Sequence, residues 1–180
     1  PVYKSDCVVW TNINTQCTPA ARDQFVPAQG QQVATNCSIN SYTNPPNSKL
    51  CEICPTGYKM NRGAFTTTCQ VCIPGQFQNV PGIEKCNHCP IGYYQSEDGI
   101  PYCVGCIPGQ YQDEAGRMAC KDCSEITAST DRKRVTPCGV CKLGTTTTTK
   151  GATTCSGCEL GHYGSANGIC SACPAGHYQD

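Results

Sequence analysis

A pair of cysteines separated by two residues, Cys-x-x-Cys, recurs eight times in this chain and constrains its fold more than any other feature. The pairs begin 15 to 18 residues apart. They are Cys51/Cys54, Cys69/Cys72, Cys86/Cys89, Cys103/Cys106, Cys120/Cys123, Cys138/Cys141, Cys155/Cys158 and Cys170/Cys173. The segments 72–89 and 106–123 are near-copies of each other, 34 residues apart. Because a fixed short period is typical of stacked units that contact mainly their neighbours, the spacing predicts a repeat protein.

The composition explains why so many cysteines are needed. Only 26 of the 180 residues are Leu, Ile, Val or Phe, a share below the ~20% at which a hydrophobic core becomes doubtful. The 19 cysteines exceed the ~8–10% that marks a disulfide scaffold. Under the chain-entropy model, each closed loop of about 15 residues contributes roughly 3 kcal/mol to stability. Disulfides on this scale predict an oxidising compartment and therefore an extracellular or cell-surface location.

The fullest units share the pattern Cys-x-x-Gly-x-Tyr/Phe-Gln-x-x-x-Gly-x-x-x-Cys, seen from Cys72, Cys89 and Cys106. The first glycine permits the positive φ of a tight turn, and the second turns the chain back. We expect the aromatic residue to lie on the disulfide, where it supplies apolar contact. The predicted fold is a small disulfide-rich repeat protein, an elongated rod of stacked ~17-residue two-stranded loops. It has little regular secondary structure and no helix.

Two units depart most from this pattern. The unit from Cys123 to Cys138 lacks both glycines and the aromatic residue, and we expect its loop to bulge or to mark a boundary. The unit from Cys173 stops before its closing cysteine, so it is predicted to be truncated. The chain starts at Pro1 without a signal peptide, which indicates a mature chain or a fragment. The predicted domains are a disulfide-containing cap or linker over 1–50 and tandem cysteine-rich repeats over 51–180.

Sequential pairing is the simplest connectivity for these cysteines. It gives Cys7–Cys17, Cys37–Cys51, Cys54–Cys69, Cys72–Cys86, Cys89–Cys103, Cys106–Cys120, Cys123–Cys138, Cys141–Cys155 and Cys158–Cys170. It leaves Cys173 unpaired within this chain, through truncation or through a bond to another chain. An interlaced alternative, Cys51–Cys69 with Cys54–Cys72 and so on, also fits the spacing and stays open at this point.

Segments such as "CPIGYYQSEDGIPYC", starting at Cys89, resemble the ephrin-receptor-like cysteine-rich repeat. They are also similar to the single-disulfide module of tumour-necrosis-factor-receptor ectodomains and to the C-terminal half of EGF-like domains. The resemblance covers residues 51–180 and implies sequential pairing, because the Cys-x-x-Gly-x-Tyr cysteine of that receptor module bonds to the next cysteine. Such repeats serve as spacers, ligand binders and fibrous elements, so the resemblance implies an architecture more than an activity.

Zinc binding and redox catalysis are the alternatives to a disulfide scaffold. The spacing Cys51-x2-Cys54-x14-Cys69-x2-Cys72 is near that of four-cysteine zinc sites, but the near-uniform period gives no alternation between spacings within and between sites. Redox catalysis by Cys-x-x-Cys needs a helix N-terminus that the pattern does not predict. His88, His162 and His177 form no constellation. We expect no enzyme activity and no cofactor.

The surface-facing motifs suggest modification rather than catalysis. Asn36-Cys37-Ser38 is an N-glycosylation sequon, and the run Thr145, Thr146, Thr147, Thr148, Thr149 is a candidate for O-glycans. The basic cluster Asp131–Arg134 is interpreted as a solvated loop tip, with contact to a glycan or anionic polymer as the alternative. A formal net charge of zero argues against a nucleic-acid partner.

These observations favour a structural extracellular repeat protein. We expect a building block of a fibre, surface coat or hair-like appendage (such as a flagellar hair), glycosylated and self-assembling end to end or laterally. Other extracellular matrix or surface proteins and glycans are the remaining expected partners. The alternative is the stalk or ligand-binding segment of a cell-surface receptor ectodomain, with its binding face on the irregular unit at Cys123–Cys138.

Overall fold

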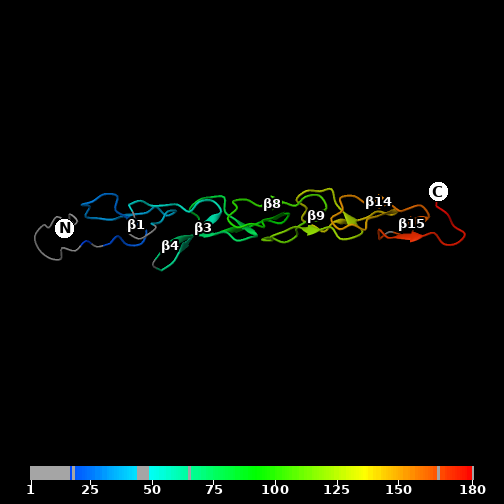
Figure 1. Cartoon of the computed structure of the whole chain (residues 1–180), viewed down its shortest axis with the longest axis horizontal. Helices are drawn as coiled ribbons and strands as arrows, with labels where there is room; N and C mark the ends of the chain where they lie inside the picture. The colour runs from blue at the N-terminus through cyan, green and yellow to red at the C-terminus, as the bar shows by residue number, and fades with distance from the viewer. Residues whose placement is uncertain (1–16, 18, 44–48, 65, 166, 180) are drawn as a thin grey trace, which may run out of the picture. The chain divides into compact units, whose positions relative to one another are not determined.

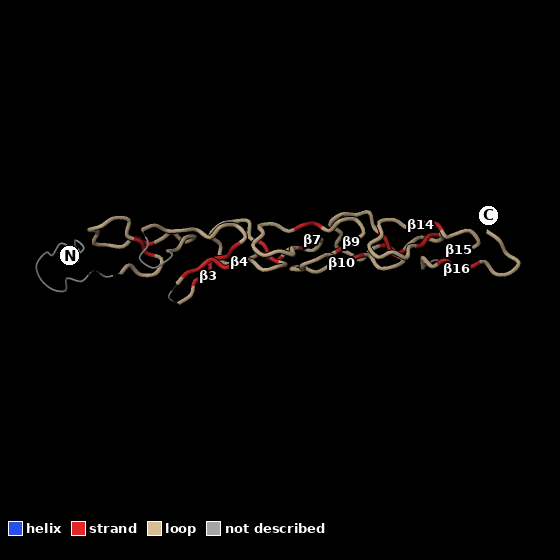
Figure 2. The backbone as a smooth tube through the Cα atoms, in the orientation of Figure 1, coloured by secondary structure: helices blue, strands red, loops and turns tan. Residues whose placement is uncertain are grey.

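The computed structural model describes residues 17, 19–43, 49–64, 66–165 and 167–179, and within them it contains short strands and turns but no helix. The strands are β1 (Gln24–Phe25), β2 (Thr35–Asn36), β3 (Tyr58–Arg62), β4 (Thr67–Val71), β5 (Gln76–Phe77), β6 (Asn87–His88), β7 (Tyr93–Tyr94), β8 (Val104–Gly105), β9 (Gln110–Tyr111), β10 (Lys121–Asp122), β11 (Thr127–Ala128), β12 (Gly139–Val140), β13 (Thr145–Thr146), β14 (Ser156–Gly157), β15 (His162–Gly164) and β16 (Cys170–Ala172). Figure 2 shows these strands as short red segments between tan loops.

Each strand pairs with its neighbour in sequence as an antiparallel hairpin. The resulting two-stranded sheets are β1–β2, β3–β4, β5–β6, β7–β8, β9–β10, β11–β12, β13–β14 and β15–β16. Most strands are two residues long, and β3–β4 is the longest hairpin, with five residue pairs. The predicted two-stranded loops without helix are therefore confirmed for the described residues.

The chain divides into two compact units, which are described separately. The first comprises residues 1–72 and 78–86, and the second comprises 73–77 and 87–180. Within the second unit the hairpins follow one another in chain order, as the colour gradient from green to red shows (Figure 1). Among the described residues, no helical segment would reach across a lipid bilayer. The division into a cap or linker over 1–50 and cysteine-rich repeats over 51–180 stays a prediction.

Disulfides close successive loops in the sequential pattern. They join Cys37–Cys51, Cys54–Cys69, Cys72–Cys86, Cys89–Cys103, Cys106–Cys120, Cys123–Cys138, Cys141–Cys155 and Cys158–Cys170. Cys17 is also disulfide-bonded, whereas its predicted partner Cys7 lies outside the described residues. Cys173 is a half-buried free thiol. The fold is a disulfide-rich repeat of stacked loops, and from β3–β4 onward the closing cysteine of each loop lies in, or directly before, the second strand of its hairpin.

Backbone hydrogen bonds join each loop to the next at fixed positions. The first glycine of a loop accepts a bond from the amide of the cysteine that opens the next loop, as Cys106 N–H donates to Gly92 O at 2.9 Å. The same glycine's amide donates to the next loop's glutamine position, as Gly92 N–H does to Gln112 O at 2.7 Å. These bonds satisfy backbone groups that a two-residue strand leaves free. A loop is therefore completed by its neighbour.

Loops also approach the next loop but one. A Cβ on Gly109 would lie 2.0 Å from the carbonyl oxygen of Gly151, two loops further on, and a Cβ on Gly75 would lie 2.1 Å from that of Gly116. Both Gly109 and Gly75 have positive φ. The first glycine is thus required twice, once for its backbone conformation and once for this close approach.

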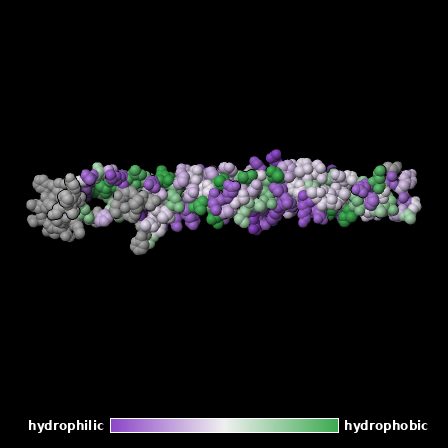
Figure 3. Space-filling view, in the orientation of Figure 1, coloured by the Kyte–Doolittle hydropathy of each residue, from purple (hydrophilic) through white to green (hydrophobic). Residues whose placement is uncertain are grey.

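Most buried residues are cysteines and polar side chains, and the hydrophobic core of the described residues is one small cluster of Tyr42, Cys54 and Met60. The opening cysteines Cys54, Cys72, Cys89, Cys106 and Cys123 are at most 1% exposed. The glutamines of the pattern, Gln78, Gln95 and Gln112, are equally enclosed, at 1–4% exposure. By contrast, aliphatic side chains such as Leu160 and Ile39 are exposed, and Figure 3 shows apolar residues scattered among polar ones on the face in view.

Candidate functional site

The Cys123–Cys138 loop keeps the repeat's backbone path although it has lost both glycines. Ile126 and Lys133 occupy the two glycine positions and adopt positive φ, 61° and 55°. Their amides make the standard inter-loop bonds, to Thr147 O at 2.9 Å and to Cys106 O at 2.8 Å. The expected bulge is therefore absent at these positions, because the neighbouring loops impose the geometry on residues that rarely adopt it.

In regular loops, a buried glutamine closes the interior. Gln112 Nε2 donates to Ala119 O at 2.6 Å, and Gln112 Oε1 accepts the Glu114 amide at 3.1 Å. Gln78 and Gln95 make the same two bonds in their own loops. Each side chain satisfies the carbonyl that precedes the closing cysteine, so the buried amide and its backbone partners are all paired.

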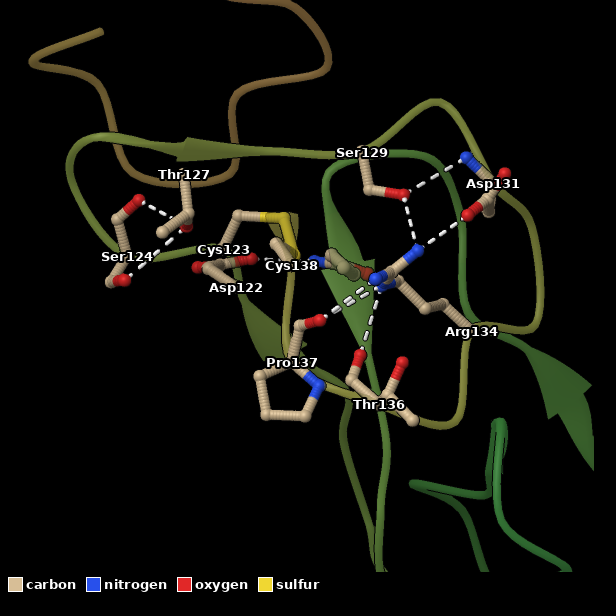
Figure 4. The surroundings of a disulfide bond; sticks show 11 residues. Asp122, Cys123, Ser124, Thr127, Ser129, Asp131, Arg134, Thr136, Pro137 and Cys138 are labelled. Atoms are coloured by element: carbon tan, nitrogen blue, oxygen red, sulfur yellow. Dashed lines mark hydrogen bonds and ion pairs between the residues drawn. A yellow bond between two sulfur atoms is a disulfide. The ribbon is translucent and has the colours of Figure 1, made fainter. Parts of the chain in front are cut away.

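In the irregular loop two residues share this task (Figure 4). Ser129 replaces the glutamine, and its hydroxyl accepts the Asp131 amide at 3.1 Å but is too short to span the loop. Arg134 reaches in from the opposite side and donates from Nη2 to Pro137 O at 2.8 Å. Pro137 precedes the closing cysteine, as Ala119 does in the regular loop. The guanidinium thus replaces the glutamine amide as the donor to the same carbonyl.

The basic cluster at Asp131–Arg134 is therefore more than a solvated loop tip. Arg134 also pairs with the Asp131 carboxylate at 2.5 Å, and its side chain is only 22% exposed. Lys133 Nζ lies 5.2 Å from the ring centroid of Tyr93, a cation–π contact. The solvated-tip interpretation is therefore wrong for Arg134, which is half-buried and bonded within the loop, whereas Lys133 is exposed.

An open groove of about 590 Å³ lies beside this loop and the next one. Its polar lining comes from Asp131 and Arg134 on one side and from Lys142, Thr145, Thr153 and Thr154 on the other. Lys142 and the last two threonines are exposed. Hydroxyls, Lys142 and the Asp131–Arg134 ion pair in an open groove suit contact with a polar extended ligand, and the groove does not enclose a reacting centre.

The candidate glycosylation sites lie in different surroundings. Thr148 and Thr149 are exposed, Thr145, Thr146 and Thr147 are half-buried, and Thr146–Thr149 line a second hollow of about 390 Å³. Asn36 is exposed in β2, and its Oδ1 accepts a bond from Gln24 Nε2 at 2.9 Å. Glycan occupancy at these positions stays a prediction.

Cysteine and histidine residues are separated by the fold. Cys51, Cys54, Cys69 and Cys72 are each in a disulfide, so they do not offer the thiolates of a four-cysteine zinc site. Two of the histidines lie in different hairpins, His88 in β6 and His162 in β15, and His177 follows the last strand. In the described part of the chain, no three His, Cys, Asp or Glu side chains are grouped to hold a metal.

A charged cluster decorates the neighbouring Cys106–Cys120 loop. Glu114 pairs with Arg117 and, at 2.8 Å, with Lys121, and Asp113 pairs with Lys121 at 2.7 Å. The hydrogen bond from Arg117, with that from Lys121, lowers the pKa of Glu114 to about 2. The bond from Lys121 likewise lowers the pKa of Asp113. All these groups are exposed, so the cluster is a solvated surface feature.

The comparisons with known proteins assign no family. No family model matches this chain, and no curated protein matches it significantly. The candidate site therefore rests on its own geometry. Sequence analysis located the irregular loop through its missing glycines but missed the role of Arg134. The one available signal was the loss of glutamine at Ser129 together with an arginine five residues later.

Proposed function

We propose that this chain is a structural repeat segment of an extracellular or cell-surface protein, a building block of a fibre, surface coat or hair-like appendage. The observation that carries the proposal is that each disulfide-closed loop is completed by its neighbours. The opening cysteines and the glutamines are buried, while aliphatic side chains remain exposed. Such a stack is stabilised with little hydrophobic core and resists proteolysis in an oxidising compartment.

The expected resemblance to ephrin-receptor-like and EGF-like repeats supports the same proposal, since those modules space and assemble extracellular proteins. The partners are other copies of this chain, matrix or surface proteins, and glycans attached at Asn36 or the Thr145–Thr149 run. Catalysis has little support, because the grooves are open and their polar groups bond mainly to the protein itself.

Self-association of the purified, oxidised protein tests this proposal. Sedimentation velocity and negative-stain electron microscopy over a concentration series, without any added partner, should show filaments, sheets or end-to-end oligomers. Enzymatic removal of glycans provides the matched comparison, because a glycan coat changes lateral packing. A strictly monomeric protein at all concentrations, with and without glycans, would contradict the fibre proposal.

The alternative is a stalk or ligand-binding segment of a receptor ectodomain, and the groove beside the irregular loop is the observation that favours it. Lys142 and Thr154 line the groove and take no part in the hydrogen bond from Arg134 to Pro137 O that closes the loop. Under this alternative, the double substitution Lys142→Ser and Thr154→Val abolishes cell-surface binding of the soluble chain and leaves its self-association unchanged. The fibre proposal predicts no change in cell-surface binding.

A further inference from the structure

The segment between Cys17 and Cys37 folds as one more repeat loop, although it lacks the Cys-x-x-Gly motif of the regular loops. Asp23, Gln24 and Phe25 stand where Gly75, Gln76 and Phe77 stand in a regular loop. Asp23 has the positive φ of the first glycine, 58°. β1 and β2 pair Gln24 with Asn36 in the register in which β5 and β6 pair Gln76 with His88.

The backbone hydrogen bonds repeat the same geometry. Cys37 N–H donates to Asp23 O at 2.7 Å, as Cys89 N–H donates to Gly75 O at 2.9 Å. A second bond in each turn also corresponds: Gln24 N–H to Ala21 O at 3.1 Å, and Gln76 N–H to Ile73 O at 3.0 Å. The two loops therefore differ in how they are closed and not in their backbone design.

The register identifies the positions of the absent bridge. In the regular loop, Cys72 stands three residues before the first glycine and Cys86 two residues before the strand partner His88. The same offsets from Asp23 and Asn36 lead to Ala20 and Ala34. Both alanines are half-buried and line a hollow of about 250 Å³ inside the loop. Alanine thus replaces both cysteines of the pair.

Side-chain bonds to the β3–β4 hairpin hold this loop in place of a covalent closure. Asp23 Oδ2 pairs with Arg62 Nη1 at 2.7 Å and accepts a bond from Thr67 Oγ1 at 3.3 Å. Arg22 donates to Gly63 O in the same hairpin. The other carboxylate oxygen, Asp23 Oδ1, is buried without a hydrogen-bond partner. The closure is therefore non-covalent and incomplete.

We propose that residues 20–37 form an openable loop, which unfolds and refolds while every disulfide of the chain stays intact. The disulfides between described cysteines all lie at or beyond Cys37, so none of them spans 19–36. When it opens, the stretch of 20 residues from Cys17 to Cys37 extends to about 70 Å at most. The device is an extensible link in an otherwise cross-linked chain. It goes beyond the proposed structural role and does not depend on it.

Amide hydrogen exchange of the oxidised protein tests the openable loop, because amides at equivalent positions of this loop and of a disulfide-closed loop can be compared in the same chain. The amides of Cys37 and Gln24 should exchange about 100-fold faster than those of Cys89 and Gln76, since one missing cross-link of this length changes the opening equilibrium by that factor. The decisive variant is the double substitution Ala20→Cys and Ala34→Cys. Its matched control is Ala20→Ser and Ala34→Ser, which adds similar volume without a bridge.

The double cysteine variant should lose two hydrogens by mass and slow the exchange of the Cys37 amide by about 100-fold, whereas the serine control should not slow it. Three results would overturn the proposal. The first is a wild-type Cys37 amide that exchanges as slowly as the Cys89 amide. The second is a bridge that forms and leaves exchange unchanged. The third is a soluble double variant whose new cysteines both remain alkylatable, which would show that the two alanines do not face each other.

Discussion

In the Cys106–Cys120 loop, glycines take both turns and the buried amide of Gln112 closes the interior. In the Cys123–Cys138 loop, Ile126 and Lys133 take the same turns, and Arg134 donates to the equivalent carbonyl from the opposite side. The backbone bonds between loops are the same in both. The difference teaches that the repeat specifies positions with physical requirements. Each position requires a particular backbone conformation, a hydrogen-bond donor or space free of a side chain. Different residues can fulfil that requirement, with different effects on the stability of the loop.

The largest expected effect comes from filling an empty space. Gly109→Ala places a Cβ against the carbonyl oxygen of Gly151, 2.0 Å away, on a backbone with φ of 83°. We expect a loss of about 3 kcal/mol or more, because neither backbone can move cheaply. Gly144→Ala is the matched control, since its φ is 80° but nothing lies within 4 Å of its added Cβ. That variant should lose only about 1 kcal/mol.

Amide exchange measures both glycine variants locally. The Cys123 amide donates to Gly109 O, and the Cys158 amide donates to Gly144 O. Equal losses in the two variants would show that only backbone conformation matters and that the approach between alternate loops contributes nothing.

The next largest effect is expected from the loss of the hydrogen bond between the Arg134 guanidinium and Pro137 O. Arg134→Ala leaves the carbonyl of Pro137 without its donor and should destabilise the Cys123–Cys138 loop by about 2 kcal/mol. Adding Ser129→Gln to Arg134→Ala should recover most of this loss, because it recreates the glutamine closure of the regular loop. Guanidinium unfolding under non-reducing conditions measures both variants. A double variant no more stable than Arg134→Ala alone would break the equivalence of the two closures.

A smaller gain is expected where the irregular loop is strained. Ile126 is β-branched and holds a positive φ of 61°, which costs about 1–2 kcal/mol. Ile126→Gly should therefore stabilise the loop by about 1 kcal/mol. The same unfolding assay checks this, with Gly161→Ala as the opposite exchange, because Gly161 has a φ of 80° and nothing lies within 4 Å of its added Cβ. A destabilised Ile126→Gly variant would show that side-chain packing outweighs backbone strain.

The smallest expected effect is a difference between the two loops in how their stability depends on pH. The pKa of Glu114 is lowered to about 2 in the folded protein, so its contribution is present above its ordinary pKa of about 4.3 and is lost as the pH falls toward 2. In the Cys123–Cys138 loop the equivalent pair is Asp131 with Arg134, but Gly139 stands where Lys121 stands, so the second cation is missing. NMR titration of the Glu114 carboxyl at low and high salt measures the shift. A titration near 4.3 at low salt would contradict it.

Much of this architecture was readable from the cysteines and glycines. The period and the two-stranded loops follow from residues that repeat, because positive φ and tight turns are local requirements. The cysteine spacing also allowed the interlaced pairing, and the sequential set was the simplest choice and the one the resemblance implied. The roles of Arg134 and Asp23 were not readable. Arg134 occupies the position of Arg117 in the regular loop, where the arginine pairs with a carboxylate and glutamine closes the loop, so its second role left no mark in the pattern. Ala20 and Ala34 stand in place of the cysteines by which the other loops are recognised. Contacts between alternate loops leave no mark except the glycines themselves.

The most direct test of the central claim is a peptide map of the native protein, alkylated under denaturing, non-reducing conditions and digested without reduction. The claim is that each loop from Cys37 to Cys170 is closed by its own disulfide, and the map should link Cys37 to Cys51, Cys54 to Cys69, Cys72 to Cys86 and each later pair likewise, with Cys173 alkylated. Interlaced links such as Cys51 to Cys69, or alkylation of cysteines throughout the repeats, would contradict it.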